Sequence, residues 1–123
     1  MSAQAPAPAV GEVARDVAAG RATPADLHAA LLAATVYCER GPAPGFRALG
    51  RPGAGVVPVF SSLEQLALAR GAVPWFSLTG ADLLDLLPAG YDLLLNAGGD
   101  APLRLRPAAV AHQVLVEVEP ERP

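Results

Sequence analysis

A chain of 123 residues is long enough for one domain with a modest core, and it leaves no room for a second catalytic or regulatory domain. Its net charge of −3 at pH 7 provides no basic surface of the kind that binds nucleic acid, so nucleic acid is not an expected partner. All nine basic residues are arginine, and the absence of lysine excludes Schiff-base nucleophiles, pyridoxal phosphate anchors and P-loop lysines.

Two helices are predicted ahead of the first strand. Residues 1–10 are rich in alanine and proline and offer too little apolar surface to offset the entropy of ordering, so we expect a disordered arm. Residues 12–19 carry apolar side chains at helical spacing and stop at Gly20, which predicts a short amphipathic helix. A capping signal over 23–26 and an apolar stripe over 27–34 predict a second helix, with one face packed on a sheet.

An apolar, β-branched run over 35–39 predicts a buried strand. The turn-rich connection over 40–45 and a further short strand over 46–49 predict a hairpin here. Cys38 is the only cysteine, so it cannot form an internal disulfide, and its apolar surroundings indicate an inert core thiol. We therefore expect a protein of the reducing cytoplasm.

The stretch 56–96 repeats one pattern, in which an apolar strand is followed by a capped helix. Strands are predicted over 56–60 and 73–78. Each precedes an S/T-x-x-E/D capping box, first Ser61-Ser-Leu-Glu64 and then Thr79-Gly-Ala-Asp82. A third strand ends at Asn96, so the order of elements predicts a parallel sheet through the repeat.

Proline and tryptophan add two expectations for these strands. Pro58 and Pro74 each remove a ladder donor, so their strands should lie at a sheet edge or carry a bulge. Trp75, the only tryptophan, is interpreted as a core anchor rather than a ligand-stacking ring because of its large area. The leucine-rich run over 83–95 is broken by charged residues, proline and glycine well short of a membrane span, and residues 1–10 do not resemble a signal peptide. No membrane partner and no export are expected.

The C-terminal part is predicted to contain a strand over 103–106, a short helix over 107–112 and a last strand over 114–118. Residues 119–123 are interpreted as a solvated acidic tail. Within Leu103-Arg-Leu-Arg106 the strict alternation places the leucines on one face, toward the core, and Arg104 and Arg106 on the other, toward solvent.

Three runs resemble the SseB family, in particular its N-terminal domain. They are Val57-Pro-Val-Phe60-Ser-Ser, the helix end Leu83-Leu-Asp-Leu-Leu-Pro88 and the strand Leu93-Leu-Leu-Asn96, in that order and spacing. The resemblance covers roughly 27–118 and implies a small bacterial α/β protein, of a kind often labelled as secretion-associated in actinobacteria. Where the family carries Asn-Pro-Gly, this chain has Asn96-Ala-Gly98, so the role of that turn does not simply carry over.

No convergent catalytic set is visible in the sequence. The Gly53-Ala-Gly55 run precedes a strand, whereas a dinucleotide fingerprint follows one. Asp82 and Asp85 share a helix face but are explained by a helix start. His28 and His112 have no neighbour at metal-ligand spacing. We therefore expect no enzyme activity, no cofactor and no metal.

We predict an α/β domain over 11–118 with a mixed sheet of about five or six strands, parallel through the central repeat, and helices packed on it. We predict a non-enzymatic protein-interaction module, an adaptor or secretion-associated protein, whose partner is another protein or a second copy of the chain. Arg104 and Arg106 are the predicted partner-binding residues, because planar guanidinium groups suit carboxylates. Charge that guards an edge strand explains the same pair.

The alternative is a small-ligand or anion-binding domain at the carboxyl edge of the sheet. Ser61, Thr79 and Asn96 would line that edge, where two helix N-termini present free N–H groups. A simpler explanation exists for Asn96, since asparagine tolerates the left-handed conformation that starts a turn.

Overall fold

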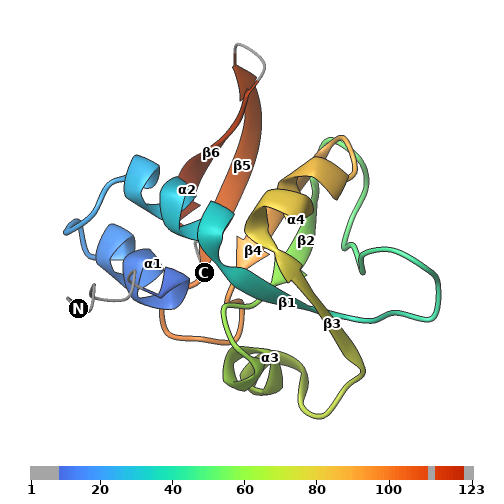
Figure 1. The fold of residues 1–123 in the computed structure, drawn as a ribbon. Coiled ribbons are helices and arrows are strands. Elements are labelled where there is room, and N and C mark those ends of the chain that lie inside the picture. The colour runs from blue at the N-terminus through green and yellow to red at the C-terminus, as the bar shows by residue number, and fades with distance from the viewer. Residues whose placement is uncertain (1–8, 111–112, 121–123) are drawn as a thin grey trace, which may run out of the picture.

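The computed structural model describes the backbone over residues 9–110 and 113–120. The fold is mixed α/β, which confirms the predicted class (Figure 1). Over the described residues the elements are α1 (Val10–Ala18), α2 (Pro24–Ala33), β1 (Thr35–Glu39), β2 (Gly55–Val59), α3 (Leu63–Arg70), β3 (Trp75–Thr79), α4 (Gly80–Leu86), β4 (Tyr91–Leu95), β5 (Leu103–Val110) and β6 (Gln113–Pro120).

The strands divide between two sheets rather than joining one. One sheet has the order β2-β4-β5-β6, in which β2 and β4 are parallel and the other pairs antiparallel. The other sheet pairs β3 antiparallel with β1, so β3 leaves the parallel arrangement that the repeat predicted. The strand that pairs with β2 is β4, whose Leu93 and Leu95 are fully buried. Along β3 polar Ser77 and Thr79 alternate with apolar residues. This pattern suits a strand at the periphery, with one face in solvent, rather than a central strand covered on both faces.

The two strands that were predicted to carry a proline both lie at sheet edges, as predicted, although only β2 contains its proline. Strand β2, which contains Pro58, is the terminal strand of its sheet. Pro74 falls just before β3, and β3 has β1 as its partner on one side. The short strand predicted over 46–49 is reduced to isolated bridges, Arg40 with Phe46 and Leu49 with Val56.

The helix starts show how local the capping signals are. Thr23 and Asp26 form a complete capping box, with Thr23 N donating to Asp26 Oδ2 at 2.9 Å. Thr79 caps α4 by accepting from Asp82 N. At α3 the cap is Ser62, which accepts from Gln65 N, so this helix begins one residue later than the predicted box at Ser61.

At the chain ends the structure shifts three predicted boundaries. The helix predicted over 107–112 does not form over its described part: β5 continues to Val110, because residues 103–110 pair in register with β6. Strand β4 pairs only with Leu103 to Leu105, so Pro107 can leave its missing N–H on an unpaired side. Helix α1 begins inside the expected arm, and β6 extends into the expected tail. Residues 1–8, 111–112 and 121–123 lie outside the described residues.

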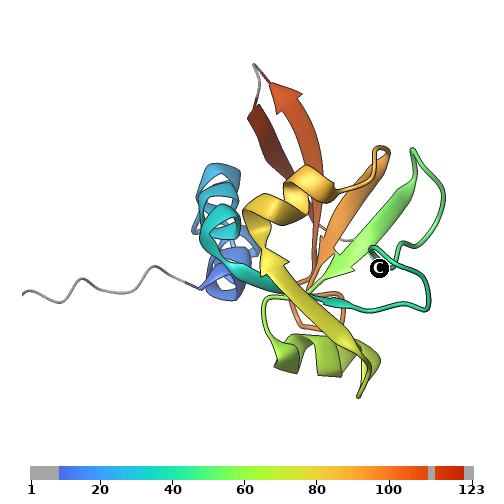
Figure 2. The same cartoon turned by 45° about the vertical axis from the view of Figure 1, so that its right-hand side comes forward.

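The core lies between the four-stranded sheet and the helices. Figures 1 and 2 show α1 and α2 side by side on one flank, α4 over the sheet, and α3 at the opposite end near β1. Leucine and valine dominate the buried cluster. Its members come from helices α1, α2 and α4 and from strands β1, β2, β4 and β5. Its members include Val10, Val13, Leu27, Leu31, Val36, Cys38, Val57, Val59, Leu83, Leu84, Leu93, Leu95, Leu103 and Leu105.

Candidate functional site

Ser61 and Asn96 meet at the carboxyl ends of the parallel strands, where the ligand-binding alternative placed them. Ser61 N donates to Asn96 Oδ1 at 2.9 Å, and Asn96 Nδ2 donates to Ser61 Oγ at 2.9 Å. Asn96 has φ 56°, the left-handed conformation that asparagine tolerates, and only 7% of its surface is exposed. The backbone N–H and the hydroxyl of Ser61 thus engage both ends of the Asn96 amide and fix the turn after β4.

Helix α1 covers this junction. A Cβ atom built on Gly11 would lie 2.8 Å from Ser61 Oγ, so the helix backbone approaches the junction closely. Thr79 is elsewhere: it ends β3, stands opposite Thr35 of β1 and caps α4. The structure therefore brings together Ser61 and Asn96, but not Thr79.

Arg104 and Arg106 lie on β5 with the predicted alternation, since Leu103 and Leu105 are buried between them. Both arginines pair with one carboxylate: Arg104 Nε lies 2.8 Å and Arg106 Nε 3.7 Å from Asp92 Oδ2. The strand register also places Glu119 and Glu117 of β6 opposite Arg104 and Arg106. The shared carboxylate of Asp92 is a partner that sequence order alone did not show.

The backbone of β3 is bonded to β1 along one side only. At one end of the strand Arg40 N donates to Pro74 O at 2.8 Å, and at the other Gly80 N donates to Ala34 O at 2.9 Å. An antiparallel ladder alternates between residues that bond to the partner strand and residues that do not. The backbone N–H and C=O groups of the even-numbered residues in this segment therefore point toward β1.

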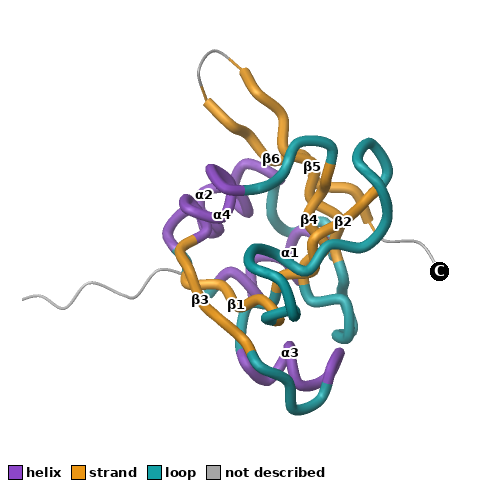
Figure 3. The backbone as a smooth tube through the Cα atoms, turned by 90° about the vertical axis from the view of Figure 1, so that its right-hand side faces the viewer, coloured by secondary structure: helices purple, strands orange, loops and turns teal. Residues whose placement is uncertain are grey.

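The odd-numbered residues of β3 turn their backbone groups the other way. The N–H and C=O groups of Trp75 and Ser77 point away from β1, to an edge at which no described strand pairs. Figure 3 shows β3 at the rim of the fold with β1 on its inner side. Contrary to the core-anchor prediction, Trp75 is 45% exposed, and its ring packs edge-on to Tyr37 with centroids 5.7 Å apart.

A groove of about 860 Å³ runs beside this strand. Phe76 and Leu78 supply the β3 wall, and Arg40 is the charged residue of the lining. The Arg40 guanidinium lies 5.7 Å from the centre of the Phe76 ring, a cation–π contact. Within the described part of the chain no carboxylate forms a salt bridge with Arg40. Other wall residues are Phe46, Leu86, Pro88 and the loop 41–45.

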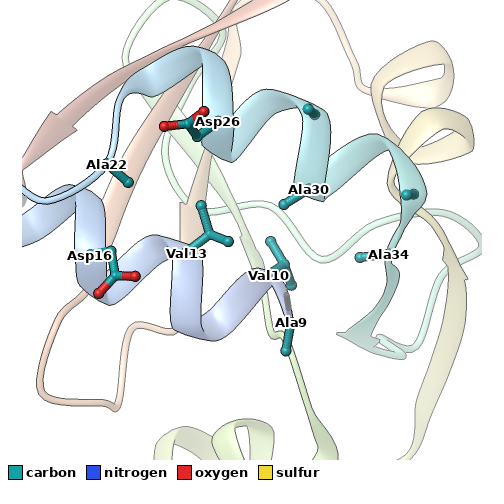
Figure 4. Close-up of a pocket in the computed structure, with 10 residues that line it drawn as sticks. Ala9, Val10, Val13, Asp16, Ala22, Asp26, Ala30 and Ala34 are labelled. Atoms are coloured by element: carbon teal, nitrogen blue, oxygen red, sulfur yellow. The ribbon is translucent and has the colours of Figure 1, made fainter. Parts of the chain in front are cut away.

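A second groove, of about 600 Å³, lies between α1 and α2 (Figure 4). Its walls are mostly alanine, with Val10 and Val13 from α1. Both of its acidic residues already have partners: Asp16 pairs with Arg21 at 3.2 Å, and Asp26 is held by the Thr23 cap. Hydrogen bonds from the Thr23 backbone and side chain lower the pKa of Asp26. This groove offers small apolar contacts and no unengaged charged group.

Cys38 is buried in β1, in agreement with a core thiol. It is 1% exposed, and burial raises its pKa to about 12, so the thiol stays protonated at neutral pH and is a poor nucleophile. Across residues 9–110 and 113–120, no group of three or more His, Cys, Asp or Glu side chains lies together as metal ligands would.

Sequence reasoning predicted an edge position for the strand near Pro74, but it did not identify that edge as a candidate binding site, and it missed Arg40 as a charged group there. The available signals were Pro74 at the strand start and the lack of any charge in Trp-Phe-Ser-Leu-Thr, which is unusual for an unprotected edge. Neither signal shows which side of β3 stays open, because that depends on pairing with β1.

Comparison with known proteins identifies the family of the chain. A model of the SseB protein N-terminal domain matches residues 5–112. No curated protein and no solved structure matches the chain. In the described ranges no helix has the length and apolar character needed to cross a bilayer. The family match includes the three runs that carry the resemblance in the sequence and extends over most of the chain, and on that basis this protein belongs to the SseB family.

Proposed function

We propose that the domain is a non-enzymatic protein-interaction module, an adaptor or secretion-associated protein of the SseB family. The observation that carries this proposal is the open β3 edge together with the apolar groove beside it. Exposed apolar surface bordered by polar groups is typical of protein-binding sites. Leu86, at the rim of the groove, is 64% exposed, and Trp75 on the same strand edge is also exposed.

Arg104 and Arg106 remain a second proposed contact of the same function. Arg106 has the more exposed side chain of the two, at 54%, so a partner can reach it from solvent more easily than it can reach Arg104. The cytoplasmic location is likewise a proposal, and the buried, unpaired thiol of Cys38 supports it.

The ligand-binding alternative has less support. An anion at the carboxyl edge would have to displace the hydrogen bonds between Ser61 and Asn96 and the backbone of Gly11. Thr79 would have to act from a separate place in the fold.

Site-specific photo-crosslinking in the native host tests the interaction module. A photoreactive residue at Ser77 reports on the β3 edge, one at Arg106 reports on the arginine pair, and one at Leu68 is the control, being 66% exposed on α3 and outside both surfaces. We expect a discrete adduct with one defined protein from position 77 or 106 and none from position 68. Adducts from no position would contradict the proposed function.

The purified partner then provides a quantitative test. Trp75→Ala combined with Leu86→Ser should weaken its binding at least about tenfold, because aromatic and apolar anchors dominate interfaces. Leu68→Ser removes an equally exposed leucine from the control surface and should leave binding unchanged.

A further inference from the structure

We propose that the open edge of β3 receives an extended segment of a partner protein as an added strand, and that the segment presents apolar side chains to the groove and a carboxylate to Arg40. This inference rests on the proposed interaction function and specifies the partner's chemistry. Strand addition needs three things: free backbone groups, room for side chains on both faces, and a feature that sets the register. The described residues provide each of them.

The backbone groups come first. Trp75 and Ser77 each direct one N–H and one C=O outward, and an incoming strand of either direction can pair with these groups. The strand has no bulge, no internal proline and no charged side chain to block pairing. Its side chains alternate between exposed and half-buried, so neither face is sealed.

The two faces differ in what they offer. Residues of the added strand that stand opposite Phe76 and Leu78 would lie over the groove, whose walls there are apolar. Residues that stand opposite Trp75 and Ser77 would lie on the other face, beside the exposed indole. The segment therefore alternates, with apolar side chains on the groove face.

Arg40 sets the register. Cys38 pairs with Phe76, and Arg40, which directly follows β1, continues this register by bonding to Pro74. Arg40 therefore projects on the groove face at the Pro74 end of β3. An added strand would lie two strand spacings from β1, about 10 Å, a gap that an arginine and a carboxylate side chain can close together. The partner residue opposite Pro74 is thus the acidic one, and its carboxylate would meet a guanidinium that forms no salt bridge within the described residues.

A second copy of the chain fits this edge less well. Two β3 strands paired edge to edge would place Trp-Phe-Ser-Leu-Thr against itself, and that segment contains no acidic residue for Arg40. The charge would stay unmatched on both copies. A heterologous acidic segment satisfies the backbone and the charge together.

Blocked synthetic peptides test the proposal on the full chain. Two probes carry alternating threonine and valine with one aspartate, Thr-Val-Thr-Val-Thr-Asp-Thr and its reverse, because the direction of the added strand is open. The controls replace the aspartate by arginine. Fluorescence of Trp75, the only tryptophan, measures binding, and amide hydrogen exchange at Trp75 and Ser77 measures strand addition. We expect one aspartate peptide to bind about tenfold or more tighter than its arginine control and to slow exchange at both amides.

Three variants separate the contributions. Ser77→Pro removes an outward N–H without taking a bond from β1 and should abolish binding, whereas Ser77→Thr keeps the N–H and should bind normally. Arg40→Glu leaves the ladder intact and should reverse the preference, so that the arginine peptide binds tighter. Because Arg40 is an exposed side chain, this variant keeps the test valid even if Ser77→Pro fails to fold.

Clear results would overturn the inference. They are the absence of any Trp75 response, equal binding of aspartate and arginine peptides, or sedimentation of the free protein as a dimer with the Trp75 and Ser77 amides already protected. If the peptides fail while photo-crosslinking at position 106 still captures a defined partner, strand addition is wrong and the interaction function stands. If crosslinking fails at every position, the function itself is wrong.

Discussion

Two regions of this fold differ in how far they are open to solvent: the junction after β2 and β4 is covered, and the edge of β3 is exposed. At the β2–β4 junction, polar side chains at the carboxyl ends of parallel strands bond to each other beneath α1, and Asn96 is only 7% exposed. At β3, backbone groups and a tryptophan face outward beside an apolar groove. The place where α/β sheets commonly bind ligands is thus filled by the chain's own side chains. The antiparallel periphery carries the open surface.

The largest predicted effect comes from breaking the sealed junction. Asn96→Ala removes both hydrogen bonds with Ser61 and forces alanine into a left-handed conformation, so we expect it to lower the free energy of unfolding by about 3 kcal/mol. Urea denaturation measures the change.

Two further variants separate the loss of the hydrogen bonds from the backbone strain. Asn96→Gly loses the same bonds without the backbone strain and should be about 1 kcal/mol less harmful. Adding Ser61→Ala to Asn96→Ala should cost little more, because the two residues act as one unit. Full additivity of the two substitutions would show that the pair does not work as described.

The next largest effect is a pH dependence of stability that arises from Cys38, on the buried face of the β1–β3 sheet. Burial raises the pKa of Cys38 to about 12 from an ordinary value of 9.0, so folding favours the protonated thiol. The contribution of this thiol to the free energy of unfolding is therefore constant below pH 9 and is lost as the pH rises toward 12. At pH 10 the loss should be about 1 kcal/mol of unfolding free energy.

The measurement is a comparison of stability at pH 8 and pH 10 in the native chain and in Cys38→Ala. The variant should lack this part of the decline. Thiol-reactive dye should label native Cys38 far more slowly than the unfolded chain. Rapid native labelling would contradict a sealed β1.

The smallest stability effect is expected at the open edge. Trp75→Ala loses an edge-on contact with Tyr37, but Trp75 is 45% exposed and lies outside the buried cluster, so the substitution should cost only about 1 kcal/mol. A thermal melt measures this. A cost as large as that of Asn96→Ala would mean that Trp75 anchors the fold and would remove the contrast between the two regions.

Much of the local structure was predictable from the chain alone. The capping boxes at Thr23 and Thr79 mark helix starts because a hydroxyl and a nearby backbone N–H need no distant partner. The buried leucines of β5 follow from strict alternation, and the left-handed turn at Asn96 follows from residue type. Pro58 correctly indicated an edge strand.

The candidate site was less accessible to sequence reasoning. Ser61 and Asn96 were correctly placed at one edge, but their mutual hydrogen bonds and the cover of Gly11 depend on segments far apart in the chain. The same holds for Arg104, whose partner Asp92 lies on the neighbouring strand. Pro107 misled the prediction, since a proline that would suit a helix start also suits a half-paired strand.

The sequence by itself determined which segments become helices or strands over most of the chain, because side-chain period and caps act over a few residues. Only the tertiary structure decided that β3 joins β1 instead of the parallel sheet, that Trp75 stays outside the core and that Arg40 lacks a salt bridge among the described residues. Strand pairing is a long-range choice, settled by which partner buries the most apolar surface. The alternation within β3 indicates a peripheral strand, but it does not specify β1 as the partner.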